Sequence, residues 1–123
     1  CDIVFLGDTS FGENYQCIRK AVGKGSILEE KGYRVVMLPR PARQYETYVN
    51  SLIVNGVVYV PIFDESTDQQ PLEVYQQFGF ERVIGLDSQT LSNDGLGSLH
   101  CITMTYPAVP LNELLRSIGG SLL

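Results

Sequence analysis

The first third of the chain alternates between short apolar runs and polar or glycine-containing breaks. Residues 3–6 form an apolar run that a Gly-Asp pair ends, which is typical of a buried strand followed by a turn. In residues 15–32 apolar positions recur at near-helical spacing, but two internal glycines interrupt them, so we expect one broken helix or two short ones. Residues 33–38 predict a second strand. The pattern over residues 1–42 therefore predicts a β-α-β segment.

The next segment has the pattern of a β-hairpin. The runs Thr47–Leu52 and Val57–Ile62 are rich in apolar and β-branched residues, and they flank the dipeptide Asn55-Gly56. Both central positions of a two-residue hairpin turn need positive φ, which Asn and Gly adopt most easily. We therefore expect two antiparallel strands here.

A helix and further strands follow the hairpin. Residues 70–78 carry apolar side chains on one helical face, and Asp68 is a suitable cap for that helix. Alternating or continuous apolar runs predict a strand at Arg82–Leu86 and another at Ile102–Tyr106. The last periodic stretch, Val109–Leu115, predicts a short amphipathic helix.

Composition adds limits to this pattern. With 123 residues, of which 44% are hydrophobic, the chain is long enough for a single domain with one core. A formal charge of -5 argues against a nucleic-acid partner and suits a cationic ligand better. No apolar run is long enough to span a bilayer, so no membrane association is expected.

Cysteine usage bears on the compartment. Cys1, Cys17 and Cys101 cannot all pair within the chain, and their spacing matches no disulfide framework or zinc site. A reducing, cytoplasmic compartment is the simpler interpretation. The alternative is a mature bacterial lipoprotein, because such a protein also begins with cysteine.

The turn before Cys101 is the strongest candidate for chemistry. The sequence Asn93 to Thr103 runs through Gly95 and Gly97 and places a thiol where the predicted strand begins. Glycines at these two positions can take positive φ and let the backbone approach a ligand closely. This arrangement would present a nucleophile, although a free cysteine is equally often a small buried hydrophobe.

Three blocks of the chain carry a family resemblance. They are Tyr45–Pro61, residues 63–73, and the glycine-containing turn that ends in Leu99–Thr103. Together they resemble the carboxy-terminal part of the bacterial agmatine deiminase and peptidylarginine deiminase family, of the guanidino-group-modifying or pentein superfamily. The resemblance runs from about Arg34 to Pro107, and the opening of the chain does not share it.

The resemblance implies an α/β fold with pentein-like ββαβ modules, a partial propeller with a mixed sheet. Residues 1–123 would form one domain, in which 45–107 is the deiminase-like module. Cys101 would be the nucleophile that attacks the guanidinium carbon, and the substrate would be a small guanidino compound or a peptidyl arginine. No cofactor and no metal are implied. Because an incomplete propeller leaves open sheet edges, a homo-oligomer or the remaining part of a longer chain is expected to cover them.

Candidate substrate-binding residues are Asp94, Asn50 and Gly97. Asp94 would contact the cation or tune the thiol, but it also suits an ordinary turn. Asn50 would line the site or be a buried strand residue. Gly97 would let the backbone approach the substrate.

The chain departs from the family pattern in its acid-base residue. Its one histidine, His100, neighbours Cys101 in a predicted strand, so the two side chains should point to opposite faces. Without an activating partner, the thiol pKa should stay near its free value. Two hypotheses remain: a fragment or truncated form of a guanidino-group hydrolase, and a catalytically silent α/β module that binds a partner or assembles.

Overall fold

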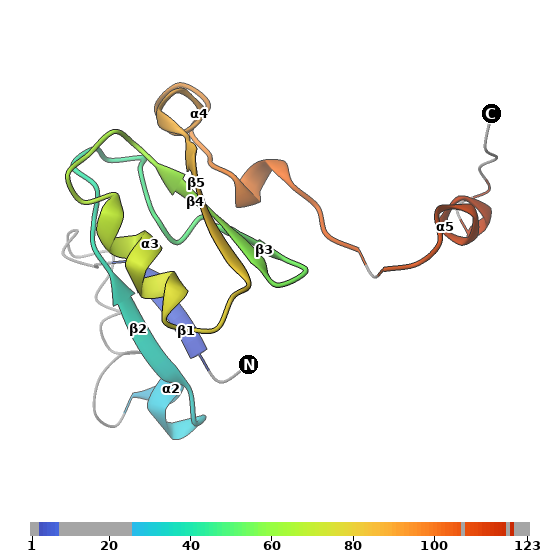
Figure 1. The fold of residues 1–123 in the computed structure, drawn as a ribbon, viewed down its shortest axis with the longest axis horizontal. Helices are drawn as coiled ribbons and strands as arrows, with labels where there is room; N and C mark the ends of the chain where they lie inside the picture. The colour runs from blue at the N-terminus through green and yellow to red at the C-terminus, as the bar shows by residue number, and fades with distance from the viewer. Residues whose placement is uncertain (1–2, 8–25, 107, 118, 120–123) are drawn as a thin grey trace.

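A computed structural model of the chain describes residues 3–7, 26–106, 108–117 and 119. Its elements are shown in Figure 1. They are β1 (Ile3–Gly7), α2 (Ile27–Glu30), β2 (Arg34–Leu38), β3 (Leu52–Val54), β4 (Val57–Ile62), α3 (Gln69–Gln76), β5 (Arg82–Asp87), α4 (Gln89–Asn93), a 3-10 turn at His100–Ile102, and α5 (Leu111–Ser117).

The two strands predicted for the opening segment are present, as is a helix at the end of the stretch between them. β1 and β2 pair in parallel from Ile3 opposite Arg34 to Gly7 opposite Leu38, and parallel neighbours require a crossover connection. The end of that crossover is α2, whose first turn is capped by the Ser26 hydroxyl, which accepts a hydrogen bond from the Glu29 N–H at 3.3 Å. The rest of the predicted helical stretch lies outside the described residues, as do Cys1 and Cys17.

The hairpin prediction is confirmed at its turn. Asn55 and Gly56 have φ of 50° and 78°, and β3 and β4 pair antiparallel on either side of them. The predicted strand Thr47–Leu52 is wrong over its first five residues. That stretch turns instead, because Ser51 Oγ donates to the Tyr48 carbonyl at 2.6 Å and the Asn50 N–H donates to the Thr47 carbonyl at 3.4 Å.

β4, α3 and β5 form a crossover unit, in which α3 connects two parallel strands. β5 pairs in parallel with β4, so the three-stranded sheet in the order β3-β4-β5 is mixed, as predicted. The predicted helix over 70–78 is confirmed as α3, and the six buried apolar residues of the core lie around it and the sheet: Leu38, Tyr48, Val58, Val60, Phe63 and Tyr75.

Aromatic contacts join the two sheets through α3. The ring of Phe5 in β1 lies 4.6 Å from that of Tyr75 and 5.2 Å from that of Phe78, measured between centroids. α3 packs against β2 as well as against β4 and β5. The helix that connects β4 to β5 therefore also supports the opening strands.

The predicted strand Ile102–Tyr106 is wrong. Local hydrogen bonds from the Cys101 N–H to the Ser98 carbonyl and from the Thr103 N–H to the His100 carbonyl form a 3-10 turn instead. Residues 103–106 and 108–110 are exposed and have no regular structure, and α5 confirms the predicted terminal helix and stands away from the sheets in Figure 1. Within the described residues no helix has the length and apolar character to cross a membrane.

Candidate functional site

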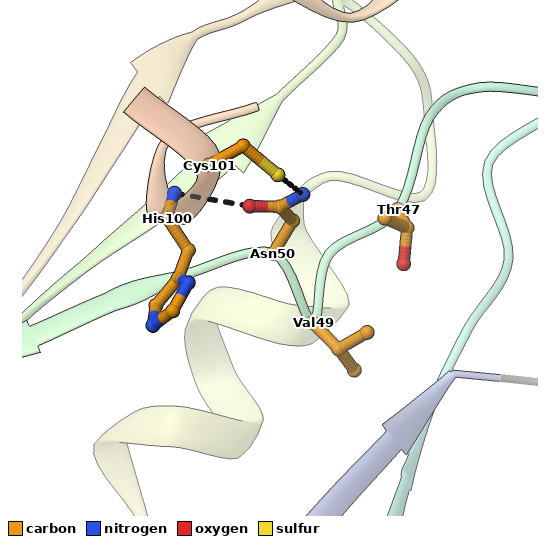
Figure 2. A pocket seen from close by; sticks show the side chains of 5 residues that line it. All are labelled: Thr47, Val49, Asn50, His100 and Cys101. Atoms are coloured by element: carbon orange, nitrogen blue, oxygen red, sulfur yellow. Dashed lines mark hydrogen bonds between the residues drawn. The ribbon is translucent and has the colours of Figure 1, made fainter. Parts of the chain in front are cut away.

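The site forms where two turns meet. Asn50 lies in the turn that leads into β3, and Cys101 lies in the 3-10 turn that follows α4. Asn50 Nδ2 donates a hydrogen bond to Cys101 Sγ at 3.0 Å, as Figure 2 shows. Two residues that are far apart in the sequence therefore meet through their side chains.

The orientation of the Asn50 amide follows from its other partner. The His100 backbone N–H donates to Asn50 Oδ1 at 3.0 Å, and a backbone N–H can only donate. The amide oxygen must therefore face His100, which leaves the amide NH₂ facing the sulfur. The same N–H also lies 3.3 Å from the Asn50 carbonyl oxygen, so the two turns share a backbone contact as well.

The turn that carries Asn50 is held by a buried tyrosine. Tyr48 is 1% exposed, and its hydroxyl lies 2.7 Å from both Thr67 Oγ1 and Asp68 Oδ1. Burial is the largest cause that raises the pKa of Tyr48. Asp68 stands at the predicted cap position of α3, but its carboxylate accepts from the Phe63 and Glu65 N–H groups rather than from the helix.

The Cys101 thiol is exposed and polarised. The hydrogen bond from Asn50 is the largest cause that lowers its pKa, and backbone hydrogen bonds at Ser98 and at Cys101 itself act in the same direction. Because hydrogen bonds to the charged form stabilise a thiolate, more of the sulfur is ionised near neutral pH than in a free cysteine. The expectation of an unshifted thiol, and that of a buried small hydrophobe, are both wrong.

A cavity of about 330 Å³ adjoins the sulfur. Its lining comes from the same two turns: Thr47, Val49, Asn50, His100 and Cys101. Figure 2 shows these side chains around the cavity, with the sulfur directed toward the Asn50 amide. The lining contains no carboxylate, so the Cys101 thiolate is the one negative charge that these five residues can offer a cation.

His100 is also among the residues that line the cavity, although the strand assumed in predicting the orientation of its side chain is absent. The prediction assumed a strand, where neighbouring side chains alternate, whereas a 3-10 turn fans them out by about a third of a revolution. In Figure 2 the imidazole and the sulfur leave the turn in different directions.

Asp94 and Gly97 lie elsewhere in the loop. Asp94 is exposed at the end of α4, where its N–H donates to the Thr90 carbonyl at 3.0 Å, and it does not line the cavity. Gly97 abuts the cysteine, since a Cβ there would lie 3.4 Å from Cys101 Cβ. The predicted positive φ at Gly95 and Gly97 is wrong, because the loop takes its left-handed residue at Leu96, with φ of 55°.

Two cavity residues were not singled out from the sequence. Thr47 and Val49 lie in a stretch that its alternating pattern assigned to a strand, and only the turn at 47–50 brings both to the thiol. No cluster of three or more metal-binding side chains occurs in the described part of the chain.

The fold and the site define an α/β protein that presents an ionisable thiol beside an asparagine. The family model for Porphyromonas-type peptidyl-arginine deiminases matches residues 8–107. The chain belongs to this family. The match begins well before Arg34, so the expectation that the opening lies outside the family is wrong.

Individual relatives agree with this assignment. The agmatine deiminase of Ectopseudomonas mendocina is 40% identical over 63 residues, which are 50% of this chain and 17% of that protein. A Streptococcus mutans protein, provisionally named an agmatine deiminase, is 31% identical over 86 residues, 69% of this chain and 21% of its own length. The chain thus spans about a fifth of the length of these relatives.

Solved structures agree on the fold. A Porphyromonas gingivalis crystal structure, provisionally named an arginine deiminase, gives a TM-score of 0.63 at 32% identity and covers 86% of this chain and 34% of its own. The agmatine deiminase of Enterococcus faecalis gives 0.62 at 20% identity, with 83% and 35% covered, which supports the fold alone. The α/β, pentein-like fold class predicted from the sequence is confirmed.

Proposed function

We propose that this chain is the nucleophile-bearing part of a guanidino-group hydrolase that acts on agmatine or on free or peptide-bound arginine, with Cys101 as the nucleophile. The observation that carries the proposal is the 3.0 Å hydrogen bond from Asn50 Nδ2 to an exposed thiol beside a cavity. A thiolate is the reactive form of cysteine, and this contact favours it.

The proposed reaction is a hydrolysis through a covalent intermediate. The Cys101 thiolate adds to the guanidinium carbon, forming a C–S bond while the C=N electron pair moves onto nitrogen. One terminal nitrogen takes a proton and leaves as ammonia, so that an S-substituted isothiourea remains. Water then adds to the same carbon, the C–S bond breaks with its electron pair returning to sulfur, and a ureido compound is released.

Asn50 would hold the thiolate in its reactive position. While its NH₂ group stabilises the thiolate, its oxygen is held by His100, so the amide cannot rotate away. The carboxylates that hold the cation and the group that protonates the leaving nitrogen would come from outside the five cavity residues. On this basis we propose that residues 45–107 act as one module within a longer enzyme.

The proposal is tested by labelling and product analysis. Chloroacetamidine mimics the guanidinium charge, whereas chloroacetamide has nearly the same shape without the charge. We expect the cationic reagent to modify Cys101 faster than the neutral one, and Cys101→Ser to remove the modification. If a longer chain containing this segment makes neither citrulline nor carbamoylputrescine, and if the cationic reagent has no advantage, the hydrolase proposal is wrong.

A second candidate is a catalytically silent module that assembles with other copies. The exposed apolar side chains of Ile102, Met104 and Tyr106, at 66%, 88% and 65% exposure, favour it. Sedimentation of the chain beside a Met104→Ser, Tyr106→Ser variant tests this candidate, which requires that the unaltered chain self-associates and the variant does not. For either candidate, an unpaired exposed thiol suits the reducing cytoplasm, where we propose that the protein resides.

A further inference from the structure

Glu46 is a buried carboxylate that the proposed reaction does not use. Its side chain is 4% exposed, and Oε1 accepts a hydrogen bond from Asn93 Nδ2 at 2.7 Å. The other oxygen, Oε2, has no hydrogen-bond partner among the residues that the structure describes. Burying a carboxylate costs free energy unless hydrogen bonds offset it, so the bond to Asn93 is worth more here than at the surface.

Asn93 stands at the start of the loop that carries the thiol. It is the last residue of α4, and its Nδ2 also donates to the Gln89 carbonyl at 2.9 Å, which ties the side chain to the helix. At the far end of the same loop, Asn50 binds His100 and Cys101. Glu46 and Asn50 therefore hold the two ends of one loop from a single short segment.

Between these anchors the Gly95 N–H donates to the Leu91 carbonyl at 3.1 Å and Ser98 is buried, but no side-chain hydrogen bond of residues 95–99 is found in the described structure. The loop contains Gly95 and Gly97, and glycine has more accessible backbone conformations than any other residue. Leu96 between them takes the sparsely populated left-handed region, with φ of 55°. A loop that loses the contact between Glu46 and Asn93 could shift its path at this end and carry the sulfur away from the Asn50 amide.

We propose that Glu46 is a positioning residue for Cys101: its buried carboxylate fixes Asn93, and through it the loop that holds the sulfur against Asn50. This inference rests on the proposed function for its biological meaning. The effect passes through geometry, because the groups that shift the pKa of the Cys101 thiol are Asn50 and backbone groups at Ser98 and Cys101, and Glu46 is not among them.

The test is the rate of Cys101 alkylation by iodoacetamide as a function of pH. Trypsin releases residues 83–116 as one peptide with Cys101 as its one cysteine, so mass spectrometry separates its labelling from that of Cys1 and Cys17. We expect Glu46→Ala to slow alkylation at neutral pH by about threefold or more and to move the profile to higher pH. Glu46→Gln keeps an oxygen that accepts from Asn93, so we expect it to restore the rate.

Matched variants keep the test decisive if Glu46→Ala does not fold. Asn93→Ala removes the same bond from the other side and should give the same shifted profile, with the double variant no slower than either single one. Glu113→Ala, which removes an exposed carboxylate of α5, should leave the profile unchanged. An unshifted profile in a folded Glu46→Ala or Asn93→Ala chain overturns the inference.

This outcome is separable from failure of the proposed function. Iodoacetamide is neutral and reports on the sulfur alone, whereas the hydrolase proposal depends on the preference for an amidine reagent and on a ureido product. If Glu46→Ala moves the alkylation profile to higher pH, but the chain shows no preference for the amidine reagent and makes no ureido product, the positioning role stands and the hydrolase proposal is wrong.

Discussion

Asn50 Nδ2 lies 3.0 Å from Cys101 Sγ, and this contact links the turn before β3 to the turn after α4. Neither residue lies in an α-helix or a β-strand, yet contacts of the two turns fix both of them. The buried side chain of Tyr48 anchors the first turn in the core, and the loop after α4 leads into the second turn. The chemistry we propose depends on these two turns keeping their relative positions.

The first prediction concerns Gly95, which the loop needs for a close backbone approach. A Cβ at this position would lie 2.6 Å from the Leu91 carbonyl oxygen, and backbone cannot move aside as a flexible side chain can. We expect Gly95→Ala to lower the free energy of unfolding by about 1–3 kcal/mol. Denaturant unfolding measures this loss.

Gly97→Ala is the matched control for that change. A methyl group there would meet Cys101 Cβ at 3.4 Å and Sγ at 3.9 Å, which is ordinary van der Waals contact. We expect its stability to stay within about 0.5 kcal/mol of the unaltered chain. Equal stability of the two alanine variants would contradict the loop geometry.

The second prediction concerns Leu96. This residue is 66% exposed and has a φ of 55°, a conformation that is unfavourable for a bulky side chain. Asparagine tolerates it better, so Leu96→Asn should raise the free energy of unfolding by up to about 1 kcal/mol. Thermal or denaturant unfolding tests this, and a less stable variant would show that the leucine side chain makes contacts that outweigh the strain.

The third prediction concerns alkaline pH. Burial raises the pKa of Tyr48, and it also raises that of Tyr75, so the folded chain keeps both phenols protonated where the unfolded chain ionises them. The folded state then binds more protons, and the free energy of unfolding falls as pH rises above about 10. Below about pH 10 both the folded and the unfolded chain keep these phenols protonated, so the full stability is expected there.

Tyr48→Phe provides the control for the alkaline effect. It removes one of the two phenols, so the decline in stability above pH 10 should become shallower, while loss of the hydroxyl contacts with Thr67 and Asp68 costs about 1–2 kcal/mol at neutral pH. Unfolding curves at several pH values measure both effects. An unchanged alkaline slope would show that Tyr48 does not contribute to it.

The elements that could be predicted are those with a strong local signal. The Asn55-Gly56 turn needs positive φ at both positions, which these two residues adopt easily. Residues 70–78 carry apolar side chains at helical spacing, which gives a helix one face to bury. The strands at 57–62 and 82–87 carry apolar runs, which suit the parallel pair β4 and β5 of the mixed sheet.

The site itself was less predictable, because long-range contacts decide it. Alternating apolar residues at 47–52 and 102–106 suggested strands, but the first stretch turns to bury Tyr48, and the second has no partner strand among the described residues. Cys101 and Asn50 were both candidates, yet no local pattern indicated that one binds the other. The hydrogen bond between Glu46 and Asn93 could not be predicted from the spacing or periodicity of residues in the sequence.

The fourth prediction isolates the Asn50 amide. Asn50→Leu keeps the volume of the side chain and removes the donor, so the thiol loses the largest cause that lowers its pKa. Asn50→Asp adds a negative charge near the sulfur and should raise that pKa further. Alkylation at neutral pH should therefore slow in the order unaltered chain, Asn50→Leu, Asn50→Asp, with Asn112→Ala as an exposed control.

The complete pH profile of Cys101 alkylation in the unaltered chain and in Asn50→Leu tests the central claim most directly. With the hydrogen bond in place, the rate should remain high below the ordinary titration range of a free thiol and fall only as the pH passes through the lowered pKa. In Asn50→Leu the inflection should move to higher pH and the rate at neutral pH should fall by about threefold to tenfold. Superimposable profiles for the two chains would show that Asn50 does not activate Cys101.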